Sequence, residues 1–104
     1  MDNWYGITIT DERVTKIELY GNNLIGHIPE ELGNLLNLTY LAIGYNKLTG
    51  ELPIELSNLN QLVLLYLGFN NLTGQIPPKL GELENLEGLY LHVNQLSGIL
   101  FFYS

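Results

Sequence analysis

Two histidines are the side chains of this chain best suited to acid–base or metal chemistry. They are His27 and His92, and they occur in a chain with eleven acidic residues, four basic residues and no cysteine. Imidazole and carboxylate groups bind a metal ion when they converge, and a serine beside a histidine can serve as a nucleophile. The serines are Ser57, Ser97 and Ser104. Each of these chemistries requires that the residues meet in space, so the elements that carry them decide the question.

A repeat of 24 residues determines where these side chains can lie. It is marked by one asparagine per unit, at Asn22, Asn46, Asn70 and Asn94. Apolar residues surround each asparagine in the pattern LxxLxLxxNxL, which occurs four times. We predict an N-terminal cap strand in 1–13 and repeats at 14–37, 38–61, 62–85 and an incomplete 86–104. Repeats of this length indicate an elongated protein in which each unit packs on its neighbours.

Each unit is expected to combine a short strand, a turn and a short helical segment. Apolar residues that alternate with other residues before the asparagine are typical of a strand with one buried face, and such strands would stack into a parallel sheet. The asparagine follows the strand, where its amide can both donate to and accept from buried backbone groups. A proline after the turn favours the start of a helix. We therefore interpret PEELGNL, PIELSNL and PPKLGEL as short 3₁₀ or α turns.

Composition excludes several classes of partner and site. The formal charge of −7 would repel nucleic acid and an anionic membrane surface. Without cysteine, the chain forms neither disulfides nor thiolate metal sites. No segment reaches the roughly 18 apolar residues of a membrane-spanning helix. We therefore expect neither nucleic-acid binding nor direct membrane insertion.

The motif LxxLxLxxNxLxGxIP at this spacing resembles the plant-type leucine-rich repeat family. That family includes ectodomains of receptor-like kinases and secreted polygalacturonase-inhibiting proteins. The resemblance covers residues 4 to about 98 and includes the cap, where Trp4, Gly6 and Ile7 match. It implies an α/β solenoid: a right-handed leucine-rich-repeat coil with short parallel strands on the concave face and short 3₁₀ or α turns on the convex face. It also implies a recognition platform without catalytic residues in the repeats.

The N-terminal stretch is expected to cover the first repeat. In the segment ITIT, Ile7 and Ile9 alternate with threonines, so an edge strand could place its isoleucines over Ile17 and Leu19. Trp4 is expected to seal the end as part of the cap core. The family that the chain resembles commonly has a disulfide-forming cysteine in its cap where this chain has Ile9.

The repeat keeps the two histidines apart. His27 falls in the turn of the first unit and His92 on the strand of the fourth, about 14 Å away along the stack. They cannot share a metal ion, and no serine, histidine and aspartate fall in neighbouring columns. The glycines recur at turns and form no phosphate-binding loop. We therefore expect no enzyme activity, no metal site and no cofactor.

Recognition is predicted instead for the solvent-facing positions of the strands, which are the third, fifth, seventh and eighth of each unit. Equivalent positions in successive units should form columns whose members are about 4.8 Å apart. Aromatic residues are concentrated in these columns, as at the centre of a protein interface. The predicted binding residues are Tyr40, Tyr45, Leu64, Tyr66, Phe69, Tyr90 and His92. They predict a protein or peptide ligand; the alternative is that they merely cover the sheet.

The fourth unit ends in an apolar run where the others continue with proline. Its residues are Ile99, Leu100, Phe101, Phe102 and Tyr103. They could fold back as a cap, or form an association surface for a homodimer at the C-terminal flank. A third alternative is that the chain is a fragment of a longer protein.

Two sequons fit N-glycosylation, at Asn37 and Asn71. Asn71 is the better candidate, because Asn37 abuts the next strand. The family resemblance suggests an extracellular or cell-surface location, whereas the lack of cysteine and of a signal peptide also permits the cytoplasm. Besides recognition, three alternatives stay open: a fragment of a receptor-like kinase ectodomain, an inhibitor of a secreted polysaccharide hydrolase, and an assembly role for the apolar tail.

Overall fold

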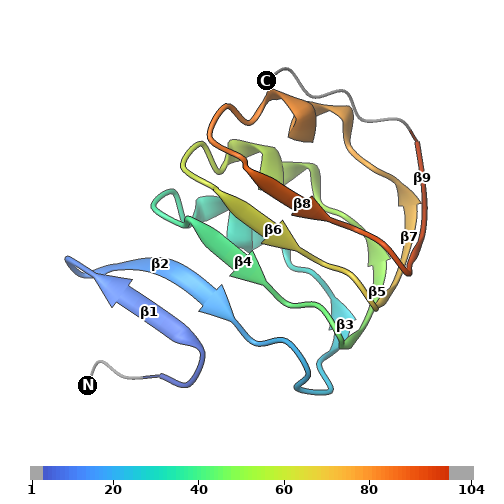
Figure 1. Cartoon of the computed structure of the whole chain (residues 1–104), viewed down its shortest axis with the longest axis horizontal. Coiled ribbons are helices and arrows are strands. Elements are labelled where there is room, and N and C mark those ends of the chain that lie inside the picture. Colours follow the sequence, from blue (N-terminus) through green and yellow to red (C-terminus); the bar gives the residue numbers. More distant parts are fainter. Residues whose placement is uncertain (1–3, 99–104) are drawn as a thin grey trace.

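A five-stranded sheet forms the concave face of the coil. In this computed structural model, which describes residues 4–98, the strand order is β1-β2-β4-β6-β8 (Figure 1). The strands are β1 (Ile7–Thr10), β2 (Arg13–Glu18), β4 (Tyr40–Ala42), β6 (Leu64–Tyr66) and β8 (Gly88–Tyr90). β1 pairs antiparallel with β2, and the other neighbours are parallel. Each repeat therefore adds one parallel strand, and the predicted solenoid is confirmed.

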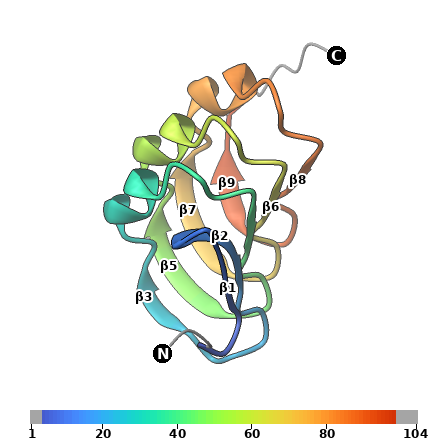
Figure 2. The same cartoon turned by 90° about the vertical axis from the view of Figure 1, so that its left-hand side faces the viewer.

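A second, four-stranded parallel sheet lies on another side of the coil (Figure 2). Its strands are β3 (Ile25–His27), β5 (Lys47–Glu51), β7 (Asn71–Gln75) and β9 (Gln95–Ser97). The sequence predicts a turn for this stretch, including His27, because so few residues interrupted by a glycine give no clear periodicity. Gly50 and Gly74 have φ of 82° and 83°, a left-handed conformation that glycine adopts without strain. Leu48 and Leu72 are buried on the inner side of these strands.

Three 3₁₀ helices form the convex side, and each follows a proline as predicted. They are η1 (Glu30–Asn34), η2 (Ile54–Asn58) and η3 (Pro78–Glu82). The N-cap residues Pro29 and Pro53 have φ of −72° and −69°, values that already suit the start of a helix. Figure 2 shows the helices stacked along one edge of the coil, away from the first sheet.

Leucines from the two middle units fill the interior. The largest fully buried side chains are Leu38, Leu41, Leu56, Leu59, Leu62, Leu65, Leu67, Leu72 and Leu80. All of them belong to units 38–61 and 62–85, which have a neighbouring unit on either side. Burial of one leucine contributes about 1.5–3 kcal/mol. The equivalent Leu89 and Leu91 of the fourth unit are only partly buried, so apolar packing is strongest in the middle of the described chain.

The asparagine of each inner unit ties its own turn to the unit before it. Nδ2 of Asn46 donates to the carbonyl of Ile43 at 2.8 Å and to that of Leu19, one unit earlier, at 3.2 Å. Oδ1 of Asn46 accepts the N–H of Leu24 at 3.0 Å. Backbone groups that would otherwise be buried without a partner are thereby satisfied.

The same arrangement recurs in the next two units. Oδ1 of Asn70 accepts the N–H of Leu48 at 3.0 Å, and Oδ1 of Asn94 accepts the N–H of Leu72 at 2.9 Å. The side chain of Asn22 has no preceding repeat to contact; it is exposed and donates to a carbonyl two residues earlier at 2.9 Å. The predicted role of the asparagine is confirmed at Asn46, Asn70 and Asn94, the three positions that have a preceding repeat.

The N-terminal strand covers the first repeat less completely than predicted. Ile7 packs against the core, but Ile9 is 42% exposed, because the pairing register between β1 and β2 shifts at this point. Trp4 is 66% exposed, so the expectation that it seals the end as cap core is wrong. A register shift of this kind cannot be read from an alternating sequence pattern.

Candidate functional site

The parallel register places the predicted binding residues in columns across the concave face. Tyr40 of β4 pairs with Leu64 of β6. Two positions further along, Ala42, Tyr66 and Tyr90 form the next column on the same face. Successive side chains alternate between the faces of a strand, so the leucine between these two columns points into the core. The spacing of the sequence repeat thus becomes a grid of outward side chains.

Aromatic rings from successive units stack along this grid. Tyr45 and Phe69 lie with ring centroids 4.3 Å apart and planes inclined by 10°. The Tyr66 and Tyr90 centroids are 5.3 Å apart, with planes inclined by 33°. Tyr45 also lies 6.3 Å from Tyr66, which joins the two columns. These four predicted residues therefore form one connected aromatic row, and offset stacking of this kind is favourable.

His92 packs into the same row. Its imidazole meets Phe69 at 5.0 Å and Tyr66 at 5.7 Å, and the planes are inclined by 88° and 85°. Edge-to-face contacts of this type are a preferred geometry for ring pairs. The prediction that His92 lies on the strand of the fourth unit is wrong: His92 follows the end of β8, and its neighbours there are aromatic rings.

Two glycines of the concave face make room for these rings. Gly44 and Gly68 occupy the seventh position of their units, which predicts exposure, but both are buried. A β-carbon on Gly44 would overlap the Tyr66 ring, and one on Gly68 would lie 3.0 Å from the His92 imidazole. The rings of one unit therefore lie on the bare backbone of the unit before. This role was missed, although the sequence places each glycine in the unit before the corresponding aromatic residue.

The Tyr66 hydroxyl is held in its neutral form. Partial burial, together with a hydrogen bond and charge interaction with Tyr45 and a weaker charge interaction with Tyr90, raises the pKa of Tyr66 above its ordinary value. Burial raises a phenol pKa because it disfavours the charged phenolate. The hydroxyl of Tyr66 therefore stays neutral, and able to donate or accept a hydrogen bond, to a higher pH than that of an ordinary tyrosine.

A pocket of about 280 Å³ opens on the part of this face nearest the N-terminus. It is lined by Glu18, Tyr20, Tyr40, Ala42, Tyr45, Leu64 and Tyr66. Four of the seven lining residues are tyrosines, contributed by three successive units, and Glu18 supplies the carboxylate. The predicted binding set omits Glu18 and Tyr20. Their place in the solvent-facing positions of the first unit is the signal that could have indicated them.

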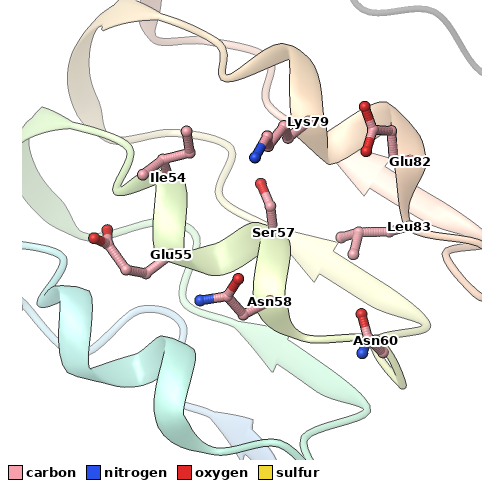
Figure 3. A pocket seen from close by; sticks show the side chains of 8 residues that line it. All are labelled: Ile54, Glu55, Ser57, Asn58, Asn60, Lys79, Glu82 and Leu83. Carbon is pink, nitrogen blue, oxygen red and sulfur yellow. The ribbon is translucent and has the colours of Figure 1, made fainter.

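A second groove, of about 330 Å³, lies on the convex side between η2 and η3 (Figure 3). Its lining residues are Ile54, Glu55, Ser57, Asn58, Asn60, Lys79, Glu82 and Leu83. Figure 3 shows Ser57 and Lys79 pointing toward each other. The Oγ atom of Ser57 is buried and has no hydrogen-bond partner within the described part of the chain. The lining mixes both signs of charge and contains no aromatic side chain, unlike the concave pocket.

The remaining predicted residues are not brought together. His27 ends β3 on the second sheet, and residues 4–98 contain no group of three side chains able to hold a metal ion. Within the same range, no helix is long and apolar enough to cross a membrane. Asn71 is exposed on β7, whereas Asn37 is half-buried. The predicted association surface lies outside the described residues: Ile99, Leu100, Phe101, Phe102 and Tyr103.

Solved structures similar to this chain include several plant receptor ectodomains. The plant peptide hormone receptor RGFR1, solved in complex with RGF2, is 33% identical over 92% of this chain, with a TM-score of 0.80. The leucine-rich repeat ectodomain of the membrane receptor kinase GASSHO1/SCHENGEN3 from Arabidopsis thaliana, in complex with CASPARIAN STRIP INTEGRITY FACTOR 2, is 42% identical over 77%, with a TM-score of 0.75. The corresponding ectodomain of the Arabidopsis thaliana receptor kinase SOBIR1 is 30% identical over 88%, with a TM-score of 0.82.

The chain is much shorter than these proteins. It spans 18% of the RGFR1 chain, 10% of the GASSHO1/SCHENGEN3 chain and 55% of the SOBIR1 chain. No curated protein sequence matches it. The family profile described as "Leucine rich repeat" matches residues 12–72, which is more than half of the sequence. The repeat spacing, the stacked parallel strands and these similarities lead to one conclusion: the chain belongs to the leucine-rich repeat family, in its plant type.

Proposed function

We propose that this chain is a non-enzymatic recognition module that binds a peptide or protein on its concave face. The observation that carries the proposal is the connected row of rings formed by Tyr45, Tyr66, Phe69 and Tyr90. Rings already held by stacking lose little conformational freedom when a partner binds. Tyrosine is also enriched among the residues that dominate binding energy at interfaces.

The similar structures favour a peptide as the ligand. RGFR1 is a peptide hormone receptor solved with RGF2, and the GASSHO1/SCHENGEN3 ectodomain was solved with CASPARIAN STRIP INTEGRITY FACTOR 2. A curved sheet with outward aromatic columns suits an extended peptide, because such a peptide can place successive side chains against successive columns.

Selection from a displayed library of random short peptides, on the immobilised chain, tests this proposal. Affinities of the selected peptides would then be measured by interferometry for the original chain and for the double variant Tyr66→Ala/Tyr90→Ala. Loss of two interface tyrosines should weaken binding by at least about tenfold, since each such residue commonly contributes more than about 1 kcal/mol.

The matched control is Tyr5→Ala, which removes an exposed tyrosine that lies outside the columns. It should leave the affinities unchanged, and thermal melts should establish that both variants are folded. Equal affinity of the selected peptides for the folded double variant and the original chain would refute the assignment of binding to the aromatic row.

A second candidate is that the chain is a segment of a receptor-kinase ectodomain. The observation that favours it is the coverage, since the chain spans only 18% of RGFR1 and 10% of GASSHO1/SCHENGEN3. The complete transcript decides between the possibilities. Further repeats followed by membrane-spanning and kinase segments would establish the candidate, whereas a reading frame that stops after Ser104 would contradict it.

A homodimer through the C-terminal flank stays a separate prediction. The leucines at that end of the described chain, among them Leu89, Leu91 and Leu96, are only partly buried. Light scattering over a concentration series, for the full chain and for a chain ending at Gly98, measures association. A dimer that becomes monomeric on truncation supports the prediction, and a full-length monomer at all concentrations contradicts it.

A further inference from the structure

The pocket nearest the N-terminus on the concave face combines aromatic walls with one carboxylate. Tyr20, Tyr40, Tyr45 and Tyr66 line it, and Glu18 is its only lining residue that is charged at neutral pH. The face of an aromatic ring attracts a cation through its quadrupole, and a nearby carboxylate adds a direct charge attraction. The lining therefore has the composition expected of a cation-binding cage.

An internal contact demonstrates this geometry within the chain itself. The ammonium group of Lys16 lies 4.6 Å from the centroid of the Tyr40 ring, inside the limit of about 6 Å for a cation–π contact. Lys16 and Glu18 are two residues apart on β2, so both side chains face the concave side. Lys16 engages one ring, and Tyr20, Tyr45 and Tyr66 supply the rest of the aromatic lining. Of these, Tyr45 also stacks on Phe69 and Tyr66 packs against Tyr90.

The distribution of basic residues argues against an anionic occupant. The chain has four basic residues and a formal charge of −7. Arg13 begins β2, Lys47 lies on the second sheet and Lys79 on the convex side, so Lys16 is the basic residue within the concave columns. Lys16 lies beside the pocket and repels a cation, whereas the net charge of −7 attracts one.

The other half of the same face lacks this combination. There His92 meets the ring of Phe69 edge to face and covers part of its surface. Tyr66 borders both halves, since it meets His92 and also lines the pocket. No acidic residue occupies the solvent-facing positions of the third and fourth units. Within residues 4–98, a carboxylate and four tyrosines line one pocket together in the first three units.

We propose that this pocket binds one basic side chain, an arginine or a lysine, of the partner that occupies the concave face. The inference rests on the proposed function for the existence of that partner. It adds the chemistry of one anchor: a cation held against tyrosine rings, with its charge balanced by Glu18.

A pair of tripeptides tests the proposal on the intact chain. Acetyl-Gly-Arg-Gly-amide and its citrulline counterpart have nearly the same shape, but only the first is charged. Chemical shifts of the isotope-labelled protein report the position and affinity of each. We expect saturable shifts at the amides of Ala42 and Gly44, and binding of the citrulline peptide that is weaker by about tenfold.

Substitutions distinguish the contribution of the Glu18 carboxylate to binding from that of the Tyr20 ring. Glu18→Gln should weaken the arginine peptide several-fold, whereas Glu51→Gln, on the second sheet, is the matched control and should not. Tyr20→Phe keeps the aromatic face and should retain binding, while Tyr20→Leu should lose it. Higher salt should weaken the arginine peptide and leave the citrulline peptide unaffected.

Four results would overturn the proposal. Three of them concern the tripeptides: equal affinity for the two, shifts that gather at the convex groove near Lys79, and no saturable shift with either. The fourth concerns the peptides selected from the library. Library-selected peptides that bind through Tyr66 and Tyr90 without any basic residue would refute the proposal that the pocket binds a basic side chain, but would leave the proposed function intact. Arginine-peptide binding that depends on Glu18 would support the cation pocket. If, in addition, no library peptide were sensitive to the double variant, the proposed role of the aromatic row would be refuted while the pocket stood.

Discussion

Asn46, Asn70 and Asn94 form an asparagine ladder, in which each side chain bonds to the backbone of the preceding unit. Replacing Asn70 with alanine removes the most buried of these side chains. Asn70 is 7% exposed. Its Oδ1 accepts the N–H of Leu48 at 3.0 Å. Its Nδ2 donates to the carbonyls of Leu67 at 3.0 Å and Ile43 at 3.2 Å. The change therefore breaks contacts within one unit and between two units at once.

The ladder limits the cost of this loss. The carbonyl of Ile43 still receives a hydrogen bond from Asn46 at 2.8 Å, and that of Leu67 still receives one from Asn94 at 2.9 Å. The buried N–H of Leu48 loses its side-chain acceptor. One unsatisfied buried donor costs about 1–3 kcal/mol, so we expect the free energy of unfolding to fall by that amount rather than by the sum of all broken bonds.

Urea denaturation followed by circular dichroism measures this difference. With a slope of about 1–3 kcal/mol per molar urea, the midpoint should move down by roughly 1 M. Asn22→Ala is the matched control, because the exposed Asn22 side chain serves no buried group of a preceding unit. It should cost less than about 0.5 kcal/mol. If both variants lost the same free energy of unfolding, burial and position in the ladder could not be what determines the size of the loss.

Three further changes test other parts of the structure. Gly44→Ala should lower stability by about 1–3 kcal/mol in a thermal melt, because its β-carbon would overlap the Tyr66 ring; an unchanged melting temperature contradicts the close approach. The pKa of Tyr66 is raised in the folded chain, so its stabilising contribution is complete below the ordinary tyrosine pKa of about 10 and is lost as pH rises beyond it. Urea unfolding should therefore show that the free energy of unfolding falls less at alkaline pH for Tyr66→Phe than for the original chain. An identical fall in the two proteins would argue against the raised pKa. In a glycosylating host, Asn71→Gln should remove a glycan mass that Asn37→Gln leaves in place, because Asn71 is exposed and Asn37 is half-buried; a glycan on Asn37 alone would reverse this expectation.

Features set by the repeat itself could be predicted from the sequence. The spacing of 24 residues places Tyr66 and Tyr90 in one column, because the same position of each unit meets its equivalent in the next. Pro53 and its equivalents mark the helix starts, since proline restricts its own φ. The fold, the ladder and the aromatic row follow from such local rules applied once per unit.

Features that depend on contacts between particular side chains could not be predicted in this way. The second sheet was missed because β5 contains a left-handed glycine, Gly50, which is more typical of a turn. Ile9 was misplaced because the shift in register is a property of the paired strands rather than of either one. Trp4 precedes β1 and lies outside the repeats, so the repeat pattern does not fix its position. The solvent-facing position of Glu18 could be read from the sequence, but its place beside four tyrosines in one pocket required the assembled side chains of three units.

The asparagine ladder also has a direction, which matters while the chain is being made. The N–H of Leu24 is accepted by Asn46, and that of Leu48 by Asn70, so each turn is completed by a residue 22 positions later. A ribosome releases the chain from its N-terminus. Each unit that has just emerged must therefore wait for most of the next unit before its own turn is closed. During synthesis, the turn nearest the growing end therefore has an unpaired backbone N–H until about one more repeat has emerged.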